Sequence, residues 1–247
     1  MLISVVIPAY NEEAYLGECL AALVSNEHGG PQRYPAAGYE VIVADNNSTD
    51  RTAEIARACG ARVVTILEKG VAHARQGGAW AATGDATKPD LVLASTDADT
   101  IVSPDWLAVI AARFQADDRL VGLMGPVYLR GGPAYARAYQ AVIMNTWFQL
   151  FHALGRPCFP GQNFAVRRAD FQAIGGYDTR MRTGEDMNLS LRLRHRGRIA
   201  WEPRLVVHTS PRRVTAGTWA NLKQGFRDYL FIALLERGTG SDLTDIR

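Results

Sequence analysis

Short apolar runs alternate with helical patterns along the first 125 residues of the chain. Runs rich in β-branched residues predict strands, and apolar residues spaced three or four positions apart predict helices. The predicted strands cover residues 2–7, 40–44, 62–67, 91–95 and 120–124. The predicted helices cover 13–25, a segment beginning at Ser48 or Thr49, 72–83, and a segment beginning at Ser103 with Pro104 at its first helical position. This alternation indicates an α/β fold with a mostly parallel sheet.

The regular alternation ends at Pro126. Beyond it the pattern predicts an aromatic helix over 135–154, a strand over 161–166, a helix over 187–196, a strand over 205–207 and an amphipathic helix over 219–235. We expect both aromatic helices to pack in the core, and an interfacial or acceptor-binding role is the alternative. The Gly- and Pro-rich stretch 28–38 predicts a surface insertion. No internal repeat divides the chain, so we expect one domain over residues 1–247.

Composition places the chain among globular proteins, since 47% of its residues are hydrophobic and 21% are charged. The three cysteines stand at unrelated spacings, which excludes a disulfide framework and a CxxC site, and a reducing, cytoplasmic location fits them best. The apolar start lacks the basic region and cleavage site of a signal peptide. The longest uncharged stretch has 18 residues and contains several polar ones, so we expect no membrane span.

Charge is divided unevenly along the chain. Residues 1–120 hold 9 Lys and Arg against 16 Asp and Glu, whereas residues 121–247 hold 18 against 9. A solvated basic face explains the basic second half, and a phosphorylated substrate, a nucleic acid or anionic lipid head groups are the alternatives.

Polar residues follow three of the predicted strands. Residues 8–13 follow the first strand, residues 45–50 the second, and Asp97-Ala98-Asp99 the fourth. Ligands of open parallel sheets bind beyond the carboxyl ends of the strands, so these turns converge on one edge. None of them carries the glycine pattern of a dinucleotide-binding or P-loop site, which excludes those classes. Two carboxylates one residue apart suit Mg²⁺ or Mn²⁺ beside a diphosphate, although a turn or a helix cap also explains such a pair.

Four motifs taken in order resemble family 2 glycosyltransferases of the GT-A fold. They are residues 5–13, residues 43–50, Asp97-Ala98-Asp99, and Gly175-Gly176-Tyr177-Asp178 followed by Gly184-Glu185-Asp186. The resemblance covers residues 2 to about 210. It implies a Rossmann-like, mostly parallel sheet flanked by helices, with residues 1–125 binding a nucleotide sugar and residues 126–247 binding the acceptor. It also implies a metal-assisted, inverting transfer of one sugar from a nucleoside-diphosphate sugar to a hydroxyl group.

The resemblance assigns donor and metal residues. The donor set is Pro8, Tyr10, Glu12, Asp45, Asn46, Lys69, Arg75 and Asp97. Mn²⁺ or Mg²⁺ would be held by Asp97, Asp99 and His208, and Arg212 and Arg213 would clamp the diphosphate. Asp45-Asn46-Asn47-Ser48 departs from the family's usual Asp-Asp-Gly-Ser, so uridine is favoured and guanosine stays possible. A helix-surface arginine at position 75, a structural histidine and a solvated arginine pair are the alternatives.

The second half supplies the acceptor side in this resemblance. The loops Gly161-Gln162-Asn163 and Gly175-Gly176-Tyr177 would face the acceptor together with Glu185, and Asp186 would be the general base. Without a function, the two loops are ordinary turns, and Glu185 and Asp186 are charges that are favourable at the start of a helix. No Gln-x-x-Arg-Trp element follows the acidic pair, which favours a single transfer over polymerisation.

The implied acceptor is a sugar, a small metabolite or a lipid-linked hydroxyl, with possible peripheral contact at the inner membrane face and no nucleic-acid partner. Two other functions stay open. A nucleotidyltransferase such as a sugar-nucleotide pyrophosphorylase would carry a glycine-rich basic loop at residues 8–13, and this chain has none there. A catalytically silent nucleotide-sugar-binding module is the second, and it would bind the donor without turnover.

Overall fold

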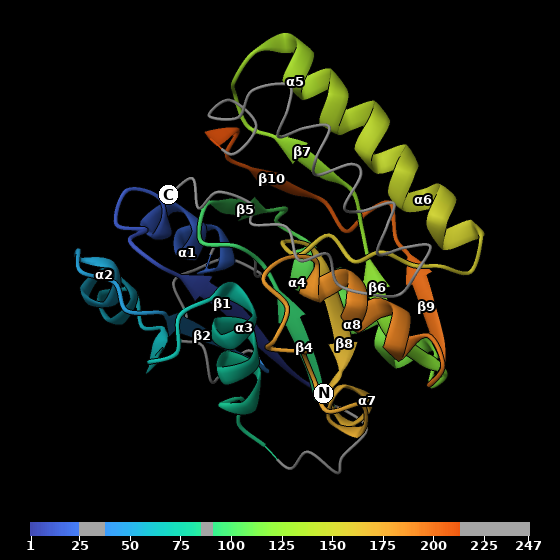
Figure 1. Ribbon diagram of the computed structural model, residues 1–247, viewed down its shortest axis with the longest axis horizontal. Coiled ribbons are helices and arrows are strands. Elements are labelled where there is room, and N and C mark those ends of the chain that lie inside the picture. Colours follow the sequence, from blue (N-terminus) through green and yellow to red (C-terminus); the bar gives the residue numbers. More distant parts are fainter. Residues whose placement is uncertain (25–37, 85–90, 213–247) are drawn as a thin grey trace.

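The computed structural model describes residues 1–24, 38–84 and 91–212. Its main sheet has seven strands in the order β3-β2-β1-β4-β8-β6-β9 (Figure 1). The strands are β1 (Leu2–Ala9), β2 (Tyr39–Asp45), β3 (Arg62–Thr65), β4 (Leu91–Ser95), β6 (Leu120–Met124), β8 (Phe164–Arg167) and β9 (Arg198–Trp201). Only β8 runs antiparallel to its neighbours, β4 and β6. The predicted α/β fold with a mostly parallel sheet is confirmed.

Helices cover both faces of this sheet. On one face α1 (Leu16–Val24), α2 (Thr52–Ala58) and α4 (Trp106–Ala116) bury their apolar sides against β1, β2 and β4. On the other face α3 (Val71–Trp80) packs on β1 and β2, α7 (Arg168–Ala173) on β4 and β8, and α8 (Glu185–Leu193) on β6. Every residue of β4 and β6 is buried, as expected for strands covered on both faces.

A smaller sheet lies beside the main one. It has three strands in the order β5-β10-β7, which are β5 (Thr100–Val102), β10 (Val207–Thr209) and β7 (Val127–Leu129). Next to it, α5 (Ala134–Ala138), a π-helical segment (Tyr139–Met144) and α6 (Asn145–Ala153) form one long helix at the margin of the molecule (Figure 1). The buried Asn145 amide bonds both backbone groups of Val127, which fixes this helix to β7.

Several predicted boundaries are wrong by a few residues. The second helix begins at Thr52 because the Ser48 hydroxyl accepts the Asn11 amide, while the Asp50 carboxylate accepts the Thr52 amide. The fourth begins at Trp106, after a turn closed by the carbonyl of Ser103. The first helix starts at residue 16, β3 ends at residue 65, and the last predicted strand lies at 207–209. In the second half, β8 begins at residue 164 and α8 spans residues 185–193.

Four elements were not predicted, namely β5, β7, β9 and α7. The insertion expected over 28–38 lies almost wholly outside the described residues, and so does the whole helix expected over 219–235. Among the helices that the structure describes, none has both the length and the apolar character needed to cross a bilayer. The cysteines of the chain are free thiols, as predicted.

Candidate functional site

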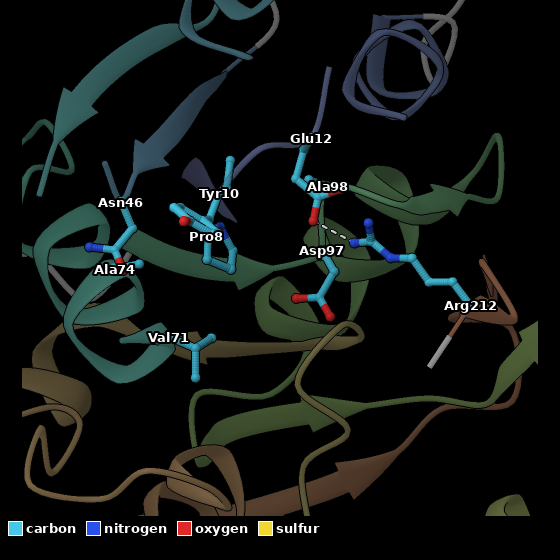
Figure 2. A pocket seen from close by; sticks show the side chains of 10 residues that line it. Pro8, Tyr10, Glu12, Asn46, Val71, Ala74, Asp97, Ala98 and Arg212 are labelled. Carbon is cyan, nitrogen blue, oxygen red and sulfur yellow. Dashed lines mark hydrogen bonds and ion pairs between the residues drawn. The ribbon is translucent and has the colours of Figure 1, made fainter. Parts of the chain in front are cut away.

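The turns after β1, β2 and β4 meet at one edge of the main sheet. A pocket there is lined by Pro8, Ala9, Tyr10, Glu12, Asn46, Val71, Ala74, Asp97, Ala98 and Arg212 (Figure 2). Because β8 is reversed, its first residue, Phe164, pairs with Ser95, the last residue of β4. The segment before β8 therefore returns to the same edge, where Gly161 contacts Arg75 and Ser95.

Side chains of the first two turns tie the pocket walls together. The Asn11 side chain accepts the Thr49 amide at 2.8 Å, and the Asp45 carboxylate accepts the Ser48 amide at 3.1 Å. The Asn46 amide donates to the carbonyls of Ile66 and Glu68, and its oxygen accepts the Gly70 amide at 2.8 Å. Asn46 thereby positions the start of α3, and its polar atoms are used within the protein.

Arg75 is the buried centre of the site. Its guanidinium donates to Ser95 Oγ and to the Gly161 carbonyl, both at 2.6 Å. It also donates to Asp97 Oδ1 at 2.8 Å, and its Nε lies 3.3 Å from Glu185 Oε1. Burial opposes the charged form, but the nearby acidic groups, Asp97 first among them, raise the pKa of Arg75. The arginine therefore joins β4, the segment before β8 and the first turn of α8.

Asp186 lies beside this centre in the first turn of α8. Its carboxylate is only 7% exposed and accepts the amide of Met187 at 2.8 Å. A Cβ on Gly161 would stand 2.6 Å from Asp186 Oδ2 and 2.8 Å from Arg75 Nη2, so only glycine allows both groups to approach the backbone there. Burial, followed by the charge of Glu185, raises the pKa of Asp186 to about 7 against the opposing effect of Arg75.

This raised pKa predicts a pH-dependent gain in stability for Asp186→Asn. The folded chain holds the Asp186 proton more tightly than the unfolded chain. The contribution of this group to the free energy of unfolding therefore falls as pH rises from about 4 to about 7 and stays low above that. The Asn variant lacks this penalty. We expect its melting temperature to exceed the parent's at pH 8, with the difference narrowing toward pH 4. Asp170→Asn, at a carboxylate paired with Arg196, is the control and should show no such gain.

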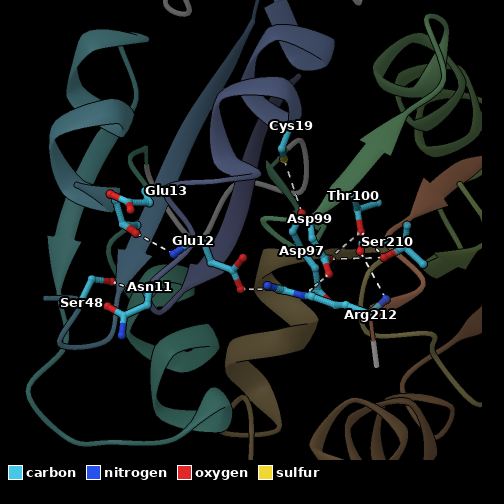
Figure 3. Close-up of polar contacts among 12 residues, drawn as sticks. Asn11, Glu12, Glu13, Cys19, Ser48, Asp97, Asp99, Thr100, Ser210 and Arg212 are labelled. Atoms are coloured by element: carbon cyan, nitrogen blue, oxygen red, sulfur yellow. Dashed lines mark hydrogen bonds and ion pairs between the residues drawn. The ribbon is translucent and has the colours of Figure 1, made fainter. Parts of the chain in front are cut away.

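Glu12 and Asp99 form a second acidic cluster, which is paired with Arg212. Arg212 Nε donates to Asp99 Oδ2 at 2.8 Å, and another of its nitrogens pairs with Glu12 (Figure 3). Thr209 Oγ1 lies 3.3 Å from Asp99 Oδ1. Burial, partly offset by Arg212, raises the pKa of Glu12. Arg212 is therefore the counter-ion of Glu12 and Asp99.

The carboxylate oxygens at this edge of the sheet are suitable ligands for a divalent cation that also binds a phosphate. Asp97 and Asp99 are buried carboxylates at the end of β4, and Glu12 Oε2 is a buried oxygen without a hydrogen-bond partner in the described structure. Within the described ranges, no three His, Cys, Asp or Glu side chains are arranged to hold an ion by themselves. One or two carboxylates completed by substrate phosphates is the usual arrangement for Mg²⁺.

The structure does not bring all the expected residues together. His208 is exposed on β10 with its ring 5.8 Å from that of Tyr128, and strand alternation directs its neighbour Thr209 toward Asp99 instead. Asn163 is buried, accepts from Trp106 and donates to the carbonyls of Pro126 and Leu205, so its amide is fully used in the core. Lys69 is exposed outside the pocket lining.

The remaining acceptor-side residues surround the Arg75 centre. Tyr177 is buried, burial raises its pKa, and its amide donates to Gln76 Oε1 at 2.8 Å. The Gly176 carbonyl accepts from Arg192, which fixes this loop to α8. Gln162 is half-buried next to Gly161, and Arg213 lies outside the described residues.

Two residues of the site, Ser95 and Gln76, were not identified from the sequence, and Gly161 was expected in an acceptor-side loop rather than as a partner of Arg75. Ser95 and Gly161 bind Arg75, and Gln76 holds the Gly175–Tyr177 loop through its amide. Ser95 carried a signal, since it is a polar residue that ends an otherwise apolar strand. Gln76 carried none, and the contact of Gly161 with Arg75 was not predicted, because these partners lie 101 and 86 residues apart along the chain.

Solved structures share this architecture. Mannosyltransferase PcManGT from Pyrobaculum calidifontis, in complex with GDP-Man and Mn²⁺, superposes with a TM-score of 0.67 at 22% identity, covering 97% of this chain and 65% of that one. TarS 1–349 from S. aureus gives 0.64 at 18% identity, covering 98% and 76%. Glucosyl-3-phosphoglycerate synthase from Mycobacterium tuberculosis, with Mn²⁺, UDP and glucosyl-3-phosphoglycerate, gives 0.63 at 22% identity, covering 98% and 83%. At these identities the likeness establishes the fold, which is the GT-A fold that the motifs implied.

Sequence relatives lead to the same family. Glycosyltransferase AglE of Haloferax volcanii is 30% identical over 198 residues, which cover 77% of this chain and 60% of that protein. Probable glycosyltransferase YdaM of Bacillus subtilis is 28% identical over 212 residues, covering 79% and 47%. The chain thus spans about half to three-fifths of the length of these relatives. The family model described as glycosyl transferase family 2 matches residues 4–175. The chain therefore belongs to glycosyl transferase family 2.

Proposed function

We propose that the chain transfers one sugar from a nucleoside-diphosphate sugar to a hydroxyl acceptor with inversion at the anomeric carbon. The observation that carries this proposal is the buried Asp186 beside Arg75, which binds the pocket-lining Asp97. The main sheet takes strands from both halves of the chain, which supports one domain with a donor-binding first half and an acceptor-binding second half.

The donor would lie in the pocket at the ends of β1, β2 and β4. Pro8, Tyr10 and Asp45 would surround the base and ribose, since short oxygen acceptors bind the N–H of a pyrimidine or a ribose hydroxyl. Asn46 would shape the pocket through the Glu68–Gly70 turn. The similar structures include one with UDP-GlcNAc and one with GDP-Man, so they are compatible with either base. A UDP-sugar stays the favoured donor, with a GDP-sugar as the alternative.

Asp97 and Asp99 would hold Mn²⁺ or Mg²⁺ together with the diphosphate. When bound, the cation neutralises charge on the departing nucleoside diphosphate. Arg212, now paired with Glu12 and Asp99, is placed to exchange these carboxylates for phosphate oxygens. Arg75 would keep the Asp97 carboxylate oriented through their buried ion pair.

This assignment predicts that Asp99→Ala uncouples nucleotide binding from Mn²⁺. In the parent, removal of Mn²⁺ with EDTA should weaken UDP or GDP binding at least tenfold, about 1.4 kcal/mol. The Asp99→Ala variant should bind weakly with or without Mn²⁺, as titration calorimetry would measure. Asp118→Ala, at an exposed carboxylate before β6, is the control. Parent binding that is unchanged in EDTA, or a variant that keeps its full Mn²⁺ response, would contradict the metal assignment.

Asp186 would act as the general base. The acceptor oxygen attacks the anomeric carbon while the bond to the diphosphate oxygen breaks, the bonding electrons leave with the nucleoside diphosphate, and the hydroxyl proton passes to Asp186. A carboxylate with a pKa of about 7 is substantially ionised at neutral pH and is still basic enough to receive that proton. Glu185, paired with Arg75, would set the charge around it. One base without a covalent nucleophile gives inversion.

A thermal-shift panel of UDP- and GDP-sugars with Mn²⁺ tests the donor assignment. A donor present at 100 times its dissociation constant stabilises the chain by about 2.7 kcal/mol. We expect a shift with one nucleotide class, and release of the nucleoside diphosphate when an acceptor is added. Binding without any turnover favours the silent binding module, and release of pyrophosphate from a nucleoside triphosphate and a sugar phosphate favours the nucleotidyltransferase.

A further inference from the structure

The long helix formed by α5, the π-helical segment and α6 exposes a concentration of apolar side chains. In the described part of the chain, eight large apolar side chains are exposed, and five of them stand on this helix or directly after it. They are Tyr135 (59% exposed), Val142 (60%), Ile143 (47%), Leu150 (50%) and Leu154 (64%). We call these five side chains the outer face. Apolar groups gathered in this way mark an interaction surface, whereas single exposed ones do not.

The opposite side of the same helix is buried. Met144, Phe148 and Phe151 pack against Met187 and Leu191 of α8, the helix whose first turn carries the acidic pair. The outer residues follow one another at intervals of 7, 1, 7 and 4 positions, which places them on one side of a helix. The helix therefore has one face that supports the site and another that points away from the molecule at its margin (Figure 1).

Charge around the outer face is positive. No Asp or Glu occurs between Asp118 and Asp170, whereas Arg137 stands at one end of the helix and Arg156 at the other. Arg130, which precedes the helix, is paired with Glu18 from the first half of the chain. Arg137 is exposed on the helix itself. The segment expected to be helical over 219–235 carries Lys223 and Arg227 against a single acidic residue, Asp228, so its charge does not complement these arginines. An apolar stripe flanked by arginines complements an anionic lipid surface.

We propose that the outer face docks on an anionic phospholipid bilayer, with Tyr135, Val142, Ile143, Leu150 and Leu154 inserted between head groups and the arginines on lipid phosphates. The docking does not depend on the transfer reaction proposed above. Because the inner face of the same helix packs on α8, the docked helix lies between the lipid surface and α8, whose first turn carries Glu185 and Asp186. An acceptor carried by a lipid follows from this only if the proposed transferase function holds.

The test is sedimentation of the 247-residue chain with vesicles, without donor or acceptor. Vesicles of phosphatidylcholine containing phosphatidylglycerol are compared with phosphatidylcholine alone. The double variant Val142→Glu/Leu150→Glu places two charges on the outer face. Leu67→Glu/Gln115→Glu adds the same charge at exposed positions away from it and is the matched control. Hydrogen exchange over residues 134–153 of the unsubstituted chain, with and without vesicles, gives a second readout that needs no variant.

The proposal expects the parent and the control to bind the anionic vesicles, with weaker binding at high salt. The outer-face variant should lose about tenfold or more in affinity, since it replaces two inserted apolar side chains with carboxylates that the anionic head groups repel. Vesicles should also protect residues 134–153 from exchange. No vesicle binding by the parent, or equal binding by the outer-face variant, overturns the proposal. So does a parent dimer that this variant dissociates, because it shows that a second copy of the chain covers the face.

Discussion

Replacing Asp186 with Asn is expected to lower turnover by roughly 10² to 10⁴, which corresponds to about 3–5 kcal/mol of activation free energy. Asn keeps the volume of the side chain and can still accept the Met187 amide, but it cannot take a proton from the acceptor. Nucleotide affinity in the presence of Mn²⁺ should stay within about twofold of the parent, because Asp186 is not among the residues that line the pocket proposed for the donor. The measurement is paired, with the turnover number from steady-state kinetics and affinity from calorimetry.

Asp170→Asn serves as the matched control for this variant, since Asp170 pairs with Arg196 outside the pocket and should leave turnover unchanged. A structural role for Asp186 gives a different pattern, in which stability and nucleotide affinity fall together. The role of general base is contradicted by an Asn variant whose turnover lies within about threefold of the parent.

Replacing Arg75 with Met is expected to have the largest effect on stability. The substitution leaves Asp97 and Glu185 buried without their shared cation, and the Ser95 hydroxyl and the Gly161 carbonyl lose a donor. Breaking a buried ion pair by removing one partner costs about 3–5 kcal/mol. In a chain of this size that lowers the melting temperature by roughly 6–20 °C, which scanning calorimetry can measure.

Arg51→Met is the control for Arg75. Arg51 pairs with Glu54 on an exposed surface, so its loss should change stability by less than about 0.5 kcal/mol. Arg75→Lys keeps the charge but cannot reach all four partners and should fall between the parent and the Met variant. A Met variant that melts within about 2 °C of the parent would show that the Arg75 centre does not hold these three segments together.

The sequence predicted best those elements whose hydrophobic pattern is strong over a short run of residues. The strands at 91–95 and 120–124 have the predicted bounds, because both are wholly buried apolar runs. The start of α2 was missed because the Ser48 hydroxyl is used by Asn11, a residue that the sequence places 37 positions away. Strands of three residues, such as β5 and β7, are too short to show a period.

The site shows the same division. Asp97 and Asp99 stand out locally as carboxylates after a strand, whereas Asp186 became a candidate through the resemblance to the family, since charges at the start of a helix also explain its position. That Arg75 joins Asp97 to Glu185 depends on the reversed direction of β8, which returns Gly161 to the edge where β4 ends. The sequence of a four-residue strand does not indicate whether the strand runs parallel or antiparallel to its neighbours, so the contact of Arg75 with Gly161 could not be predicted from local sequence. His208 differs from expectation for a related reason, because strand register decides which side chain of β10 faces Asp99.

The most direct test of the proposed reaction is the anomeric configuration of the product, read by proton NMR as it forms. The donor is the nucleotide sugar that stabilises the chain in the panel, with Mn²⁺ and hydroxyl acceptors of the sugar, metabolite and lipid-linked classes. Direct displacement with Asp186 as the base predicts a β-linked product from an α-linked donor, and its loss in Asp186→Asn. A product that retains the donor's configuration would contradict the proposed mechanism.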